Sequence, residues 1–344
     1  MKKVKFGVIG AGHIGKRHME MIRRNPSFEL VAFADIKSPE ECSVDTNLPY
    51  FSDYRDLLKT HSDLDVVCIC TPNGLHSAQA IDALNADCHV VIEKPMALTR
   101  SEGEEVLHSA LSKGKQVFCV MQNRYSPPSI WLKDVIQNGT IGAIHMVQVQ
   151  CYWNRDDRYY SKNPWKGTHD LDGGTLFTQF SHFIDLMYWI FGDIHKIQSR
   201  FADFTHQHNT DFEDSGLISF EFVNHNALGL FNFSTAVANQ NFESSITVIG
   251  EHGTIKVGGQ YMNEVEKCEI KGYDMPELPP SNPANDYGHY KGSAANHGYI
   301  FENIEATLNG REEITTNALE GLKVVDIIER MYAAGKRPEK HAAE

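Results

Sequence analysis

The first third of the chain alternates short apolar runs with helix-like segments. The apolar runs cover residues 4–9, 28–35, 64–70, 88–94 and 116–121. Between them, apolar residues recur at helical spacing in 13–24, 53–60, 74–86 and 101–113. Apolar strands that alternate with amphipathic helices are typical of a parallel sheet covered on both faces. We therefore expect an α/β domain over residues 1–122.

After residue 122 the apolar positions follow a shorter period. In residues 144–153 every second side chain is apolar or aromatic, namely Val147, Val149, Cys151 and Trp153. The same alternation recurs in 195–204, 215–222, 226–235, 244–250 and 254–257. Such runs predict an open, mostly antiparallel sheet with one covered face. A second α/β domain is expected over 123–344, with a long loop at 273–298 and a final helix, 317–334, that can pack back onto the first domain.

Composition narrows the class of protein. The chain has 344 residues and a formal net charge of −13, which disfavours binding to nucleic acid or to an anionic membrane. Its apolar runs are shorter than the roughly 20 residues of a membrane span. The seven cysteines are scattered and form no CxxC pair, so a reduced cytoplasmic protein without a metal site is expected.

Glycines at the start of the first predicted helix have a spacing with chemical meaning. The run VIGAGHIG, residues 8–15, follows a strand and fits G-x-G-x-x-G. Such a turn lets the backbone approach a pyrophosphate, and the helix start offers N–H groups to it. Asp35 ends the second strand, where a carboxylate binds ribose hydroxyls and repels a 2′-phosphate, although Lys37 lies nearby. The motif predicts NAD, bound by Gly10, Gly12, His13, Ile14, Gly15 and Asp35.

Two further strand ends carry polar residues. Thr71-Pro72-Asn73 follows the third apolar run, and Glu93-Lys94-Pro95 follows the fourth. Ligands of an open parallel sheet bind at the carboxyl ends of its strands. An ammonium at the end of a buried strand is costly unless it has a partner or a lowered pKa. A strand-end lysine by itself is more often exposed or ion-paired, but beside a dinucleotide site we expect Lys94 to be catalytic, and Lys94–Pro95 is a candidate cis peptide. Further cofactor contacts are expected from Thr71, Pro72, Asn73, His76, Glu93 and Lys94.

Residues 173–191, GGTLFTQFSHFIDLMYWIF, follow the pattern of one apolar helix. At about 100° per residue, its polar side chains share a single stripe, formed by Thr175, Thr178, Gln179, His182 and Asp185. The stripe contains neither Lys nor Glu, so it suits a polar cavity better than a solvated face. His182 is a candidate base for a hydroxyl proton, with Lys94 as cationic donor; the reverse assignment and a shared proton stay open.

Together these motifs resemble those of the Gfo/Idh/MocA oxidoreductases. The resemblance rests on the glycine motif, on Glu93-Lys94-Pro95 and on the Gly173-Gly174…His182 segment, and it covers nearly the whole chain. It implies a Rossmann domain, an open-faced α/β domain, an NAD(P) cofactor, and oxidation or reduction of a sugar or cyclitol hydroxyl. It also implies catalytic roles for Lys94 and His182. A homodimer or homotetramer is expected.

One departure from the family bears on the substrate. Many members, inositol dehydrogenases included, carry Asp four residues before the histidine, where this chain has Thr178. A threonine cannot act as a carboxylate, so a polyol substrate is disfavoured. One branch, the UDP-N-acetyl-2-amino-2-deoxyglucuronate dehydrogenases of surface-polysaccharide biosynthesis, oxidises a sugar C3 hydroxyl. This chain resembles that branch in the residues Gly173, Gly174, Leu176, Gln179, His182, Asp185, Leu186 and Trp189.

Such a substrate would need counter-charges and ring-stacking side chains. Basic candidates in this acidic chain are Arg124, Arg155, Arg158, Lys162 and Lys166. Asn296 and His297 are further candidates from the long loop. Two alternatives stay open: a dehydrogenase of a free sugar or cyclitol, and a non-catalytic NAD sensor, which would need neither Lys94 nor His182. Substrate contacts are expected from Lys94, Arg124, Tyr152, Trp165, Lys166, Thr178, Gln179 and His182.

Overall fold

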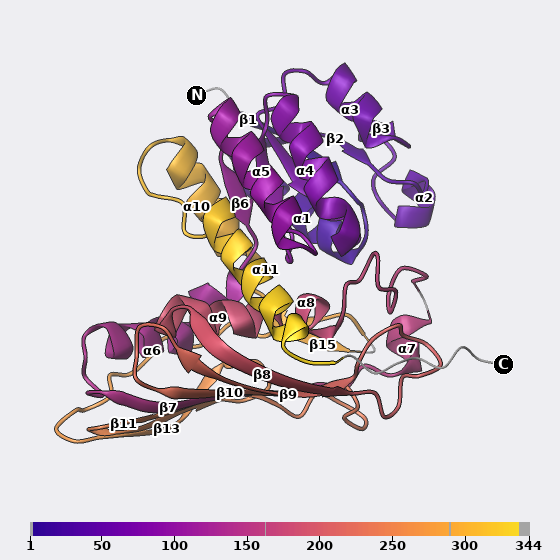
Figure 1. Ribbon diagram of the computed structural model, residues 1–344. Helices are drawn as coiled ribbons and strands as arrows, with labels where there is room; N and C mark the ends of the chain where they lie inside the picture. Colours follow the sequence, from indigo (N-terminus) through magenta and orange to yellow (C-terminus); the bar gives the residue numbers. More distant parts are fainter. Residues whose placement is uncertain (1–2, 162, 289, 337–344) are drawn as a thin grey trace. The chain divides into compact units, whose positions relative to one another are not determined.

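The computed structural model describes residues 3–161, 163–288 and 290–336 and divides into two compact units (Figure 1). The first unit comprises Met1–Met121 and His297–Val325, and the second comprises Gln122–Asn296 and Asp326–Glu344. Lys162, a candidate from the sequence, lies outside the described residues.

The first unit is built on a parallel sheet of six strands in the order β3-β2-β1-β4-β5-β6. The strands are β1 (Val4–Ile9), β2 (Phe28–Ala34), β3 (Tyr50–Phe51), β4 (Val66–Ile69), β5 (His89–Ile92) and β6 (Val117–Cys119). The order runs outward in both directions from β1 and β4. Because crossovers between parallel strands are right-handed, this order places helices on both faces, as the apolar runs predict.

Helices cover this sheet at positions that the sequence largely predicts. They are α1 (His13–Arg24), α2 (Pro39–Cys42), α3 (Tyr54–Thr60), α4 (His76–Asn85), α5 (Arg100–Lys113), α10 (His297–Leu308) and α11 (Ala318–Ala333). The beginning of α11 enters the core with α4 and α5 through Ala318 and Leu322. Helix α10 packs beside α1. Two distant segments of the chain thus complete the first unit.

The second unit contains a mixed sheet of seven strands in the order β13-β12-β11-β7-β10-β9-β8. The strands are β7 (Ile144–Tyr152), β8 (Ile194–Ala202), β9 (Ser215–Phe222), β10 (Leu228–Ser234), β11 (Glu243–Gly250), β12 (Gly253–Gly258) and β13 (Glu264–Ile270). All neighbours are antiparallel except β7 and β10, which run parallel. The expected open, mostly antiparallel sheet is confirmed.

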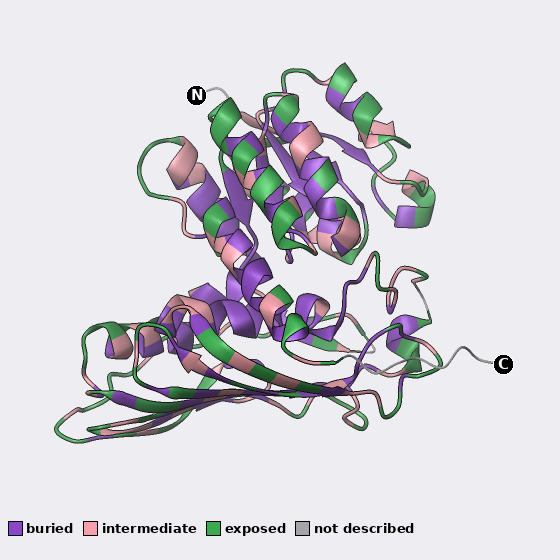
Figure 2. Cartoon of the chain, viewed as in Figure 1, coloured by how far each residue is buried: buried purple, intermediate pink, exposed green. Residues whose placement is uncertain are grey.

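One face of the second sheet is covered by helices, and burial alternates along its strands (Figure 2). Helices α6 (Pro127–Gln137) and α9 (Ser181–Phe191) pack together, and α9 also contacts β7. The core beneath α9 is aromatic: the ring of Trp153 meets those of Phe180 and Phe183 at 5.7 and 5.5 Å. Such edge contacts add to the stabilisation from burial.

Two local expectations are wrong. Residues 173–191 form two helices, α8 (Thr175–Thr178) and α9, because the chain breaks at Gln179–Phe180. The single polar stripe is therefore lost, and its side chains bond in different directions. The segment 273–298 is also more ordered than a loop, since it contains β14 (Ala284–Asp286) and β15 (Lys291–Ala294). The short helix α7 (Asp157–Tyr160) completes the unit.

Candidate functional site

Four segments singled out from the sequence follow neighbouring parallel strands of the first unit. The glycine turn follows β1, Asp35 follows β2, Thr71-Pro72-Asn73 follows β4, and Glu93-Lys94 follows β5. The carboxyl ends of parallel strands share one edge of the sheet, and the strand order reverses between β1 and β4. Ligands of open α/β sheets bind at such a reversal. The fold thus gathers the predicted cofactor residues at one edge.

The three glycines of the motif are required for three different reasons. Gly10 has φ +90°, and a Cβ there would lie 2.7 Å from the carbonyl of Cys70. A Cβ on Gly15 would lie 1.9 Å from the carbonyl oxygen of Gly10, so the helix can approach the strand only without it. A Cβ on Gly12 would meet no described atom within 4 Å. The space beside Gly12 fits the close approach of a cofactor pyrophosphate.

Two further features of this turn fit a dinucleotide. Helix α1 begins at His13, and its N-cap residue, Gly12, has no side chain to cap it; the N-terminus of a helix favours an anion such as a phosphate. The Asp35 carboxylate accepts hydrogen bonds from the N–H groups of Ala11 at 2.7 Å and Lys37 at 2.9 Å. Asp35 is therefore fixed beside the turn, where a ribose would need it.

Substitution of two of these glycines separates folding from cofactor binding. We expect Gly12→Ala to leave the melting temperature unchanged but to weaken NADH binding about tenfold or more, since a methyl group occupies the ligand's space. Gly15→Ala should lower both stability and NADH affinity, because its Cβ displaces the Gly10 carbonyl. Calorimetric titration with NADH and thermal melting measure the two effects. Full NADH affinity in Gly12→Ala would contradict the assignment.

The His76 side chain lies between the segments that follow β4 and β5 and contacts a backbone carbonyl of each. It is buried, with Nδ1 2.7 Å from the Pro95 carbonyl oxygen and Nε2 2.8 Å from that of Thr71. Burial lowers the pKa of His76, so its neutral ring donates to one of these oxygens at a time. Lys94–Pro95 is a cis peptide bond, as predicted. The predicted cofactor residue His76 thus holds the backbone directly after Lys94.

In the second unit, Arg124 is held by a buried ion pair. Its Nε and Nη2 donate to the Asp185 carboxylate at 2.8 and 2.6 Å, and both side chains are almost completely buried. The guanidinium also lies over the ring of Trp189, 5.4 Å from its centroid. The Nε/Nη2 edge of Arg124, one of the two edges on which a guanidinium binds a carboxylate bidentately, is therefore occupied by Asp185.

Cationic and aromatic side chains gather around Arg155. This buried guanidinium donates through Nε to Gln179 Oε1 at 2.6 Å, and Gln179 Nε2 donates to the Tyr159 hydroxyl at 2.7 Å. Lys166 lies over the same Tyr159 ring, with Nζ 3.5 Å from its centroid. Tyr290 adds a second ring beside both cations. Gln179, predicted to contact substrate, has both amide atoms engaged in this cluster.

His182 lies at the start of α9 and is buried. Four residues earlier, the Thr178 hydroxyl donates to the carboxylate of Asp172, which is itself buried and accepts a hydrogen bond from the N–H of Gly167 at 2.7 Å. The Asp172 carboxylate is thus hydrogen-bonded to Thr178, at the position where the sequence resemblance led us to expect an aspartate in many related enzymes. Tyr152 ends β7, and Trp165 lies one residue before Lys166, both partly exposed.

Sequence reasoning missed several residues of these clusters. His18 lies three positions after the last glycine of the motif and contacts Glu93, a pairing without a local signal. Asp172 lies in the run NPWKGTHDLDGG, where nothing in the spacing sets it apart from Asp170. Asn296 donates to the carbonyl of Gln122 at 3.2 Å and supports the fold of the second unit, whereas His297 belongs to the cluster around Glu93.

Comparison with family models decides the relationship that these features suggest. A model described as "Oxidoreductase family, NAD-binding Rossmann fold" matches residues 4–121, and one for the GFO/IDH/MocA C-terminal domain matches residues 130–256. The chain belongs to the Gfo/Idh/MocA family. The predicted resemblance, the α/β fold class and the NAD-binding domain are thereby confirmed.

Three known proteins show how similar this chain is to individual relatives. The WlbA dehydrogenase from Bordetella pertussis, solved with NADH and UDP-GlcNAcA, is 30% identical over 97% of this chain and 96% of that chain, with a TM-score of 0.83. The uncharacterized oxidoreductase YrbE of Bacillus subtilis is 27% identical over 79% of this chain and 73% of that protein. Inositol 2-dehydrogenase of Salmonella typhimurium is 29% identical over 56% of each, so the chain matches about half of that relative.

These findings establish the class of activity. The protein is an NAD-binding oxidoreductase of a family of sugar and cyclitol dehydrogenases. In residues 3–161, 163–288 and 290–336, no helix combines the length and hydropathy needed to cross a bilayer.

Proposed function

We propose that this protein is a dehydrogenase of a nucleotide-activated sugar acid and that it oxidises the C3 hydroxyl of a UDP-N-acetylhexosaminuronate. The observation that carries the proposal is the likeness to WlbA, which extends over 97% of this chain at 30% identity. That structure was solved with UDP-GlcNAcA and NADH. The match to inositol 2-dehydrogenase is of similar identity but covers 56% of the chain.

Two residues are assigned to proton transfer. NAD, when bound, accepts the hydride that leaves the carbinol carbon. The hydroxyl proton must leave at the same time, so a base is needed at that oxygen and a cation is needed to stabilise its developing charge. We assign His182 as the base and Lys94 as the cationic donor. His182 is offered by the first turn of α9, and Lys94 by the strand end after β5.

The substrate end of the proposal rests on the cluster around Tyr159. Lys166 borders an open hollow of about 490 Å³ in the second unit, whose other lining residues include Asp157, His208, Asn209 and Asp211. Small-molecule sites span about 300–1,000 Å³. Lys166 would pair with a phosphate or carboxylate, and Tyr152 and Trp165 would cover sugar or base rings. Arg124 and Gln179 would act by holding these elements in place.

A free cyclitol or sugar is the second candidate substrate, and one contact favours it. The Thr178 hydroxyl is bonded to the Asp172 carboxylate, so an acid lies next to the position where many polyol enzymes carry aspartate. Asp172 could therefore supply the charge that Thr178 lacks. Thr178 therefore disfavours a polyol substrate less than the sequence alone suggests.

A substrate panel tests the choice between these candidates. We expect UDP-N-acetylglucosaminuronate to be oxidised at least about 100-fold more efficiently, in kcat/KM, than myo-inositol or free N-acetylglucosamine, because one bound anionic group supplies about 3 kcal/mol. NADH absorbance measures the rates, with UDP-N-acetylglucosamine as the control that lacks the carboxylate. Turnover of inositol without turnover of any UDP-sugar would reject the proposed substrate. If the protein binds NAD but turns over no compound of the panel, the alternative of a non-catalytic NAD sensor would be favoured.

A further inference from the structure

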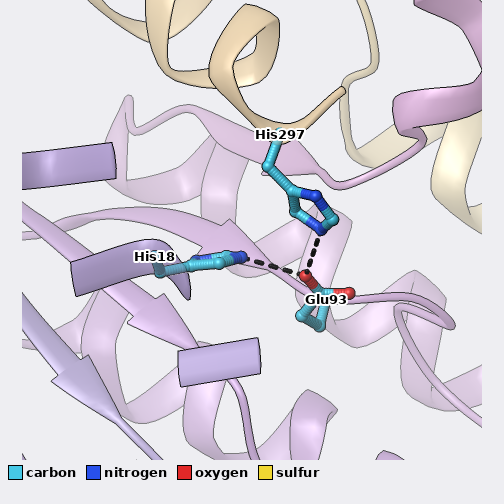
Figure 3. A group of neighbouring side chains, drawn as sticks. All are labelled: His18, Glu93 and His297. Atoms are coloured by element: carbon cyan, nitrogen blue, oxygen red, sulfur yellow. Dashed lines mark hydrogen bonds and ion pairs between the residues drawn. The ribbon is translucent and has the colours of Figure 1, made fainter. Parts of the chain in front are cut away.

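Three buried side chains of the first unit converge at Glu93, the residue directly before Lys94. His18 of α1, Glu93 after β5 and His297 of α10 are 0%, 6% and 2% exposed. Figure 3 shows both imidazole rings directed at one oxygen of the Glu93 carboxylate. His18 Nε2 lies 2.9 Å from Glu93 Oε1, and His297 Nε2 lies 3.7 Å from the same oxygen. We call these three residues the Glu93 cluster.

Two histidines and a carboxylate could form a metal site, but this geometry fits a proton better. The 2.9 Å contact between His18 and Glu93 is an ordinary hydrogen bond. A metal-bound histidine almost always donates its other N–H to an acceptor. Among the described residues, Nδ1 of His18 and Nδ1 of His297 have no hydrogen-bond partner. The outer hydrogen bonds that orient metal-bound histidines are therefore missing on both rings.

The other carboxylate oxygen of Glu93 faces Lys94. Glu93 Oε2 accepts a hydrogen bond from the backbone N–H of Lys94 at 3.3 Å. On the far side of Lys94, His76 holds the carbonyl of Pro95. The backbone on either side of Lys94 is thus fixed by a side chain. The strand itself is anchored by the hydrogen bond from the Glu93 N–H to the Ile69 carbonyl at 3.1 Å.

Titratable groups surround Glu93 from several elements packed against it. They are His18 and His297, with Arg17 acting on His297, the neutral thiols of Cys68 and Cys70 on β4 and at its end, His76 on α4, and Lys94. Burial opposes ionisation of Glu93, but the hydrogen bond with His18 and the electrostatic effect of the two imidazoles outweigh it and hold the pKa of Glu93 well below its usual range. The pKa of His76 is lowered mainly by burial and raised by its hydrogen bonds with the Pro95 and Thr71 carbonyls; the Glu93 charge raises it and the Lys94 charge lowers it by smaller amounts. Both charges therefore reach the same ring.

We propose that Glu93 is a positioning residue for Lys94: its ionised carboxylate, held by His18 and His297, fixes the Lys94 backbone and stabilises the Lys94 ammonium. A buried negative charge beside an amine favours the protonated amine. The cluster also links α1, which begins at the dinucleotide turn, to the strand end that carries Lys94. The inference rests on the proposed catalytic role of Lys94.

The decisive variant is Glu93→Gln, which keeps the size of the side chain and removes its charge. We expect the pKa of Lys94 to fall by about one unit, because the ammonium loses its neighbouring negative charge. Reductive methylation with ¹³C-formaldehyde followed by NMR titration reads this value, with Lys94→Arg identifying the resonance by its absence. The titration needs no sugar, so it succeeds or fails independently of the proposed substrate. Where a substrate is turned over, the pH profile of kcat should move in the same direction.

A matched control is available on the same helix pair. Glu305 of α10 accepts hydrogen bonds from Asn25 at 2.8 Å and Ser27 at 3.1 Å, beyond the end of α1. Glu305→Gln should lower the melting temperature without moving the Lys94 titration. An unchanged Lys94 pKa in Glu93→Gln, or an equal shift in Glu305→Gln, would overturn the proposal. A melting temperature that rises with added Zn²⁺ in the wild type, but not in His297→Asn, would replace it with a metal site.

Discussion

Replacing Lys94 with alanine is expected to lower kcat by about 10³–10⁴-fold and to weaken NADH binding much less, since one of several cofactor contacts is lost. The reason is that a positioned proton donor or cation acts mainly in the transition state, so its loss reduces kcat more than ground-state binding. The turnover number with the best panel substrate and the calorimetric Kd for NADH measure the two quantities. His182→Gln should show a comparable loss in kcat.

Another lysine of the first unit provides a control for the loss of kcat in Lys94→Ala. Lys59 of α3 is exposed and paired only loosely with Asp56, at 3.6 Å. Lys59→Ala removes the same group from the same unit and should leave kcat unchanged. Lys94→Arg keeps the charge but not the compact ammonium, and we expect it to recover less than a tenth of the lost rate. Full turnover in Lys94→Ala would remove Lys94 from the mechanism.

Breaking the Arg124–Asp185 pair is expected to destabilise the second unit severely. Both side chains are at most 1% exposed, and Asp185 accepts two hydrogen bonds from the guanidinium. Removing one member of such a pair strands a buried charge and costs about 3–5 kcal/mol. Guanidinium unfolding of Asp185→Ala, followed by tryptophan fluorescence, measures the loss. All the tryptophans, at 131, 153, 165 and 189, lie in the second unit, so the signal reports that unit.

A double variant distinguishes the cost of leaving one buried charge unpaired from the cost of losing side-chain packing. Arg124→Met combined with Asp185→Leu removes both charges, and we expect it to be more stable than either single variant, because buried ion pairs gain little over apolar side chains of similar volume. The exposed pair Lys267–Glu269 on β13, in the same unit, provides the comparison. Lys267→Ala should cost no more than about 0.5 kcal/mol. A loss in Asp185→Ala no larger than that would show that the buried pair is not important for stability.

The sequence predicts the strands and helices of the first unit well because their signals are local. A buried parallel strand is apolar throughout, and a helix that packs on it repeats its apolar residues every three or four positions. The elements that escaped prediction lack such signals. Strand β13, EVEKCEI, is an edge strand with mostly exposed residues, so it shows little apolar alternation. Helix α10 follows a segment rich in Pro, Asn and Gly that suggests a loop.

Contacts between distant residues explain the remaining differences. The break between α8 and α9 lies where Gln179 is held by Arg155 and Tyr159, which are 24 and 20 residues away. Helical periodicity describes neighbours three or four residues apart and carries no information about such partners. The same holds for Arg124, whose bidentate partner Asp185 lies 61 residues along the chain.

The sequence by itself determined the fold class, the family, NAD as cofactor and the placement of Asp35 and Lys94 at strand ends. Each of these predictions rests on particular residue types at short spacings along the chain. Such spacings carry information because the turns that join neighbouring strands and helices accept only certain residues. Only the tertiary structure decided how those residues are supported: the return of α10 (His297–Leu308) to the first unit, the Glu93 cluster and the Thr178–Asp172 contact. A buried polar side chain must find a partner, and folding, rather than chain order, brings that partner within hydrogen-bond distance.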